Sequence, residues 1–71
     1  MRNRALKVEL NGKTTELENV ETVGDLIRSK DLKPQMVAVE LNGEILPREQ
    51  FDEQRLNDGD RLEIVHFVGG G

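Results

Sequence analysis

Apolar and polar residues alternate over positions 5–10, which places Leu6, Val8 and Leu10 on one side of an extended backbone. This period of two is typical of a strand with one buried face. An Asn-Gly pair follows at positions 11–12 and suits both central positions of a type I′ turn. The pattern therefore predicts a β-hairpin.

A two-residue turn also fixes which residues face each other across the hairpin. It places Leu6 opposite Leu17 on one face and Lys7 opposite Glu16 on the other. The first pair joins two apolar side chains and the second joins opposite charges, so both faces favour this register.

The apolar spacing then changes to that of a helix, because Val23, Leu26 and Ile27 are spaced i, i+3, i+4. Thr22 precedes them as a capping residue, and Asp25 completes a capping-box pattern three positions later. We expect a helix that runs to about position 30 and packs its apolar stripe on a sheet.

The second half of the chain predicts three further strands. Positions 36–41 alternate again and end at a second Asn-Gly pair, and positions 45–46 form a short return strand. Pro47 has no amide hydrogen for a strand ladder, so positions 47–54 are expected to form a loop or a single helical turn anchored by Phe51.

Alternation divides the last strand, positions 61–68, between two faces. The core face takes Leu62, Ile64, His66 and Val68, and the opposite face takes Arg61, Glu63, Val65 and Phe67. The whole order predicts an α+β domain over residues 1–68, with one helix on one face of a mixed sheet, followed by a glycine tail over residues 69–71.

Composition narrows the classes of function. A chain of 71 residues is too short for an elaborate internal active site, and without cysteine it has no disulfide and no thiolate metal site. The expected location is the cytoplasm, since no apolar run matches a signal peptide or a membrane span. The net charge of −4 argues against nucleic acid and favours basic protein surfaces. We expect a monomer when the chain is free.

Three glycines, Gly69, Gly70 and Gly71, end the sequence directly after the last strand. Glycine loses much backbone entropy on ordering, so they are expected to project as a mobile peptide. One interpretation is a frayed end without a function. Another is a segment without Cβ atoms that threads a narrow channel and delivers its carboxylate to the active site of another protein.

Other residues are weaker candidates for a functional role. Val65 and Phe67 point away from the core near the glycines, and the aromatic ring either contacts a partner or covers the end of the sheet. Without cysteine or a second histidine, a metal site that includes His66 would consist mostly of carboxylates, so His66 is instead expected at the edge of the core. No metal site and no catalytic set of side chains is expected, and Arg48 has no assigned role.

Several segments together resemble the thiamine-biosynthesis sulfur carrier proteins, which are small ubiquitin-like β-grasp domains. They are the first Asn-Gly hairpin, the segments Asn42-Gly43-Glu44-Ile45-Leu46-Pro47-Arg48 and Asp58-Gly59-Asp60, and the ending Glu63-Ile64-Val65-His66-Phe67-Val68-Gly69-Gly70-Gly71. The resemblance implies a sheet of four to five strands whose first and last strands are parallel neighbours at its centre.

The same resemblance implies a mechanism. An adenylating enzyme, which holds the ATP and Mg²⁺, would attach AMP to the carboxylate of Gly71. A sulfur donor such as a cysteine desulfurase would replace AMP and leave a thiocarboxylate for thiazole synthase. Gly70 and Gly71 would carry the reaction and Gly69 would add reach, while the chain itself binds no cofactor and catalyses nothing.

Three other functions remain open. The small subunit of molybdopterin synthase shares the fold and the glycines, but such proteins tend to carry prolines and a small residue where this chain has His66-Phe67-Val68. A ubiquitin-like modifier would be joined through Gly71 to lysines of other proteins. A plain β-grasp binding module would work without its glycines.

Overall fold

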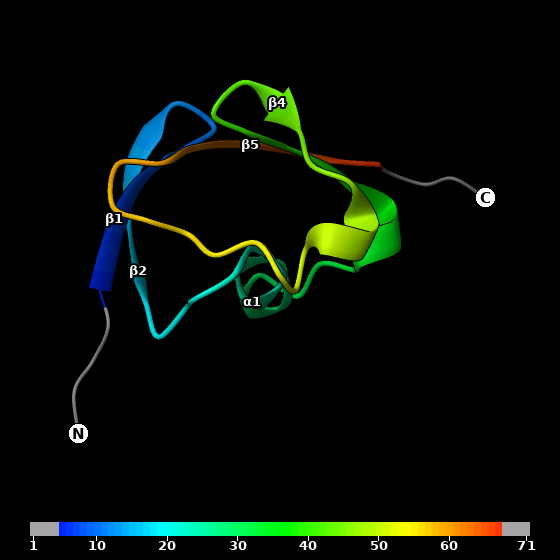
Figure 1. The fold of residues 1–71 in the computed structure, drawn as a ribbon, viewed down its shortest axis with the longest axis horizontal. Helices are drawn as coiled ribbons and strands as arrows, with labels where there is room; N and C mark the ends of the chain where they lie inside the picture. Colours follow the sequence, from blue (N-terminus) through cyan, green and yellow to red (C-terminus); the bar gives the residue numbers. More distant parts are fainter. Residues whose placement is uncertain (1–4, 68–71) are drawn as a thin grey trace.

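The computed structural model describes residues 5–67, which form a five-stranded mixed sheet with one short helix against one face (Figure 1). The elements are β1 (Ala5–Leu10), β2 (Lys13–Glu18), α1 (Val23–Ser29), β3 (Val37–Leu41), β4 (Glu44–Ile45) and β5 (Arg61–His66), with short 3₁₀ helices η1 (Pro34–Met36) and η2 (Arg48–Gln50). The strand order is β2-β1-β5-β3-β4, and β1 runs parallel to β5. The predicted fold class is therefore confirmed, with five strands.

The hairpin has the predicted register, with Leu6 opposite Leu17 and Lys7 opposite Glu16. Asn11 and Gly12 have φ values of 50° and 83°, as both central positions of a type I′ turn require. A second turn of this kind, with positive φ at Asn42 and Gly43, joins β3 to β4.

Helix α1 begins with the predicted capping box. The Asp25 amide donates to Thr22 Oγ1 at 3.1 Å, and the Thr22 amide donates to Asp25 Oδ2 at 3.2 Å. The next two amides are bonded to a loop, because Val23 donates to the Gln54 carbonyl at 3.0 Å and Gly24 to the Phe51 carbonyl at 2.9 Å. The start of α1 is thus fixed by protein groups, with no amide of this first turn left for an anion.

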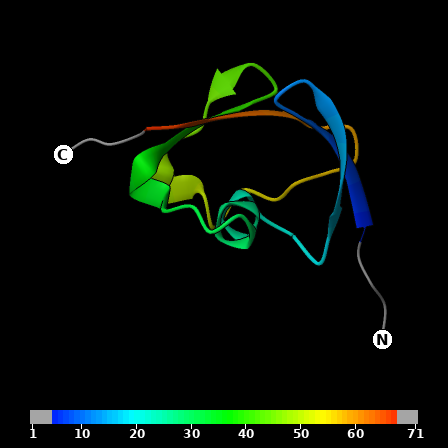
Figure 2. The same ribbon diagram turned by 180° about the vertical axis from the view of Figure 1, so that it is seen from behind.

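The core lies between α1 and the sheet, and two opposite views place the helix on the same face (Figures 1 and 2). Leu26, Ile27 and Leu62 have no exposed surface. Phe51 is 4% exposed and anchors the turn after η2, as predicted. The other face of the sheet has no helix over it in the part of the chain that the structure describes.

Two strand boundaries differ from the prediction. Strand β3 starts at Val37 and not at Met36, because Pro34 begins a 3₁₀ turn that includes Met36. Strand β4 ends at Ile45, since Leu46 turns into the core, where its amide donates to the Val39 carbonyl at 2.9 Å. Strand β5 reaches His66, and the predicted continuation to position 68 lies outside the described residues.

Candidate functional site

The last residues of β5 have fewer strand neighbours than its first, because β1 is staggered along β5 and ends opposite Leu62. Arg61 and Leu62 pair with Glu9 and Leu10 of β1, and the chain then turns at Asn11. Strand β3 continues alongside, so His66 is still opposite Val37. Beyond the strand, the Phe67 amide donates to the Met36 carbonyl at 2.8 Å.

The side chain of Asn11 takes the place of the missing strand neighbour. Its Oδ1 accepts a hydrogen bond from the Ile64 amide at 2.8 Å, and its Nδ2 donates to the Ile64 carbonyl at 3.3 Å. Asn42, in the other Asn-Gly turn, also bonds to β5, from the side of β3. Its Oδ1 accepts a hydrogen bond from the Arg61 amide at 2.9 Å. Sequence reasoning assigned both asparagines to turns only, although their repetition was the available signal.

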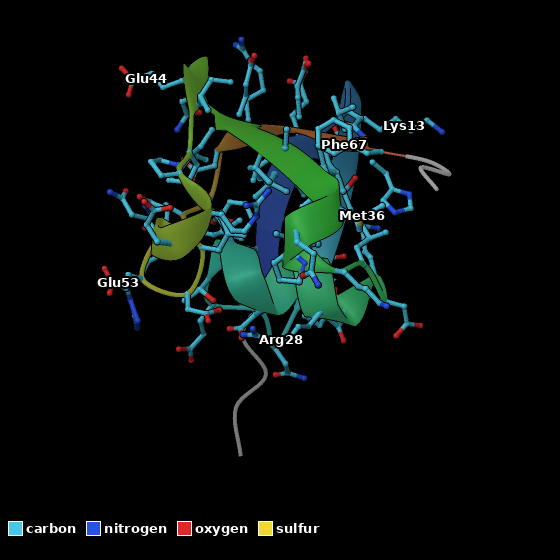
Figure 3. The ribbon with its side chains drawn as sticks, turned by 90° about the vertical axis from the view of Figure 1, so that its right-hand side faces the viewer. Lys13, Arg28, Met36, Glu44, Glu53 and Phe67 are labelled. Carbon is cyan, nitrogen blue, oxygen red and sulfur yellow. The ribbon has the colours of Figure 1, made fainter. Side chains whose placement is uncertain are left out.

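An apolar surface lies at the end of β5, on the face of the sheet that has no helix over it. We call it the open-face patch, and it consists of Ala38, Ile45, Val65 and Phe67. Ile45 is 69% exposed, Val65 55% and Phe67 49%. A hollow of about 260 Å³ lies between these residues. In Figure 3, which views the molecule from the end of β5, Phe67 lies near the top and Arg28 of α1 at the bottom.

The charge on this face is acidic where the patch lies. Glu40 and Glu63 are directly opposite each other on β3 and β5, and both line the hollow. Within residues 5–67 neither carboxylate has a hydrogen bond or an ion pair. Two like charges in such a position cost the fold about 0.2–1 kcal/mol. A basic and apolar partner surface would complement this arrangement.

The residues that the sequence singled out for a functional role lie in different parts of the structure. Val65 and Phe67 lie together on the uncovered face, as the alternation predicts, while their contact with a partner stays a prediction. His66 lies beside the half-buried residues Leu32 and Ile64, at the edge of the core as expected, and it is exposed because β1 and α1 do not extend far enough to cover it. Gly69, Gly70 and Gly71 lie outside the described residues.

The other polar groups are structural. Arg48 Nε donates to the Pro34 carbonyl at 3.0 Å and so ties η2 to η1. Arg28 bridges Asp25 and Asp52 at 3.0 and 2.9 Å. The Glu21 amide and the Arg28 guanidinium, both bonded to Asp25, hold the pKa of that carboxyl below its usual range. These contacts join segments that are distant in the sequence and stabilise the fold.

The described residues contain no group of three or more side chains that could hold a metal ion. None of the helices in this part of the chain has the length and apolar character needed to cross a membrane.

The parallel pairing of first and last strands, with one helix across a mixed sheet, defines a ubiquitin-like β-grasp protein. The fold matches the crystal structure of the thiamine biosynthesis protein ThiS from Geobacter metallireducens with a TM-score of 0.76. The two sequences are 38% identical, and the match covers 93% of this chain and 100% of that one. The model of the ThiS family matches residues 5–71, and the chain belongs to that family.

Two similar proteins bear on the function. The sulfur carrier protein ThiS of Bacillus subtilis is 45% identical over 65 residues, which cover 90% of this chain and 98% of that protein. A thiazole synthase of Paramagnetospirillum magneticum is 39% identical over 66 residues, which are 93% of this chain but only 20% of the enzyme. That enzyme therefore contains a segment similar to this whole domain.

Proposed function

We propose that this chain is a cytoplasmic sulfur carrier that supplies the sulfur for the thiazole part of thiamine. The carrying atom is the terminal carbon of Gly71, present as a thiocarboxylate when the carrier is loaded. The observation that supports this most is the ThiS family match, which extends through the glycines to residue 71. The open-face patch, beside the strand that leads to those glycines, provides the protein contact that such a carrier needs.

The chemistry has to be supplied by partner enzymes. A carboxylate is a poor electrophile, so an adenylating enzyme with ATP and Mg²⁺ first converts Gly71 into an acyl-adenylate and releases pyrophosphate. The outer sulfur of a persulfide, as formed on a cysteine desulfurase, then attacks the carbonyl carbon and displaces AMP. A thiol cleaves the resulting sulfur–sulfur bond, which leaves the thiocarboxylate on Gly71.

This chain contributes position and recognition. The bonds of Asn11 to Ile64 and of Met36 to Phe67 fix the direction in which β5 leaves the sheet. The open-face patch docks first on the adenylating enzyme and then on thiazole synthase. Gly69 and Gly70, without side chains, pass through the narrow entrance of each partner's site.

Similarity to a segment of thiazole synthases favours thiamine over molybdopterin as the destination of the sulfur. The small subunit of molybdopterin synthase, a ubiquitin-like modifier and a simple binding module remain the alternatives. The two carriers both predict a thiocarboxylate on Gly71 and differ in the acceptor of the sulfur, whereas a modifier predicts a bond to lysine and a binding module no change at Gly71.

The test is the intact mass of the protein after incubation with the adenylating enzyme, ATP, a cysteine desulfurase and cysteine. The full chain should gain the mass of one sulfur in place of one oxygen, whereas a chain lacking Gly71 should not change. The loaded carrier should then pass its sulfur to thiazole synthase and not to a molybdopterin precursor. An unchanged mass, with enzymes that load the Bacillus subtilis carrier, would contradict the proposal.

A further inference from the structure

A second hollow lies at the end of β5, on the face opposite the open-face patch. We call it the basic hollow, and its volume is about 460 Å³. Its apolar lining comes from Leu10, Leu32 and Ile64, and its polar lining includes Lys13, Lys30 and His66. Lys13 projects at the right-hand edge in Figure 3. None of these six residues belongs to the patch described above.

The hollow exists because the elements beside β5 end before β5 does. Strand β1 ends opposite Leu62, whereas β5 continues to His66. Helix α1 has seven residues and is about 10 Å long, while the six residues of β5 span about 20 Å. The helix therefore leaves Ile64 half-buried, and this incompletely covered part of the core forms the apolar floor.

The charge around this floor is opposite to that of the rest of the domain. The whole chain has a net charge of −4, yet no carboxylate among the described residues lines the basic hollow. Lys13 and Lys30 are exposed, and neither forms an ion pair within residues 5–67. The two faces at the end of β5 thus carry opposite charges. Lysines line the basic hollow, whereas Glu40 and Glu63 line the hollow of the open-face patch.

We propose that the basic hollow is a second docking site, which takes a segment of thiazole synthase that carries an Asp or Glu side chain next to an apolar one. The apolar side chain covers Ile64 and Leu32, and the carboxylate lies between the ammonium groups of Lys13 and Lys30. This inference rests on the proposed function. Thiazole synthase would then contact both faces of the end of β5, at the open-face patch and at the basic hollow, directly before the glycines.

The test compares charge reversals inside and beside the hollow. Lys13→Glu and Lys30→Glu each change the rim, and Lys33→Glu is the matched control, because it makes the same change in charge at an exposed lysine outside the hollow. The affinity of each variant for purified thiazole synthase is measured by titration calorimetry at low and high salt. Lys13→Glu and Lys33→Glu should unfold at the temperature of the wild type, since no described ion pair is removed. Lys30→Glu should unfold at a slightly lower temperature, because Lys30 is the C-cap of α1 and the new carboxylate faces the negative end of the helix dipole.

We expect Lys13→Glu and Lys30→Glu each to weaken binding by about tenfold and to make it less sensitive to salt, with Lys33→Glu within about twofold of the wild type. Equal affinities for all variants, or equal losses including Lys33→Glu, would overturn the second site. So would a wild-type carrier that is loaded at Gly71 but does not bind thiazole synthase. Failure of the proposed function is distinct from these results, because the wild type would then not be loaded at all.

Discussion

The two ends of β5 differ in how much of their apolar surface the rest of the domain covers. At its start, Leu62 is paired with strands on both sides and has no exposed surface. At its end, Val65 and Phe67 are held from one side only and are about half exposed. The alternation of side chains is the same throughout. Part of the difference is the face, because Leu62 points to the core and Val65 and Phe67 to the face without a helix (Figure 1). On the core face itself, β1 and α1 end before β5 does, which leaves Ile64 half-buried and His66 exposed.

The two ends therefore contribute differently to the free energy of folding. Burying a large aliphatic side chain contributes about 1.5–3 kcal/mol to folding. Val65 and Phe67 make only part of this contribution, because about half of each side chain is exposed. The like charges of Glu40 and Glu63 lower the stability further. We interpret the end of β5 as a surface kept for association.

The largest expected effect is on the free energy of unfolding. Leu62→Ala should lower it by about 3 kcal/mol, because the cavity opens at a fully buried position. Val65→Ala, three positions later, should lower it by less than about 0.5 kcal/mol. Urea denaturation of both variants measures the difference, and equal losses would mean that the two ends are not distinct.

The next effect is on binding. Phe67→Ala should weaken the binding of thiazole synthase about 30-fold, which corresponds to about 2 kcal/mol for an aromatic contact at an interface. The temperature of unfolding should stay at the wild-type value, because the ring is half exposed. The affinity is measured by calorimetry. A loss of stability with unchanged affinity would assign Phe67 to the fold, where it would cover the end of the sheet.

A smaller effect is expected at Ile64, between the start and the end of β5. Asn11→Gly keeps the turn, since glycine accepts its positive φ, but removes both bonds to Ile64. The free energy of unfolding should fall by about 1 kcal/mol because water replaces the lost partner. Amide hydrogen exchange should accelerate at Ile64 and not at Leu62. Uniform acceleration along β5 would show that Asn11 supports the whole strand.

The smallest effect concerns pH and lies away from the end of β5. Asp25 has a lowered pKa in the folded chain, mainly through the Glu21 amide, so its ionised form contributes stability above the pKa of the unfolded chain. That contribution is lost as the pH falls through the lower, folded value, below about pH 4. Asp25→Asn should flatten the acid limb of unfolding measured against pH. The affinity for thiazole synthase at neutral pH should not change, and a change would link the helix to the docking surface.

Local patterns predicted much of this fold from the sequence. The Asn-Gly pair determines the hairpin register, and the positions of Thr22 and Asp25 determine the start of α1. Alternation predicts which face of β5 carries Val65 and Phe67. All of these follow from interactions between residues close in the chain or from a strict period.

The features that escaped prediction depend on contacts between distant residues. Asn11 and Ile64 are 53 positions apart, and no periodicity indicates that one side chain completes the ladder of the other. Lys13 and Lys30 line the same hollow only because the hairpin and the end of α1 meet beside β5. The exposure of His66 also escaped prediction, since the alternation gives its face but not how far the neighbouring elements extend.

The most direct test of the account is to record methyl NMR spectra of the carrier as thiazole synthase is added. We predict that the signals of Ile45, Val65 and Ile64, on the two faces of the end of β5, broaden or shift first. The methyl groups of Val20 and Leu56, on the far side of the domain, should keep their positions. Changes centred on those two residues, with Val65 and Ile64 unaffected, would contradict the assignment of recognition to the end of β5.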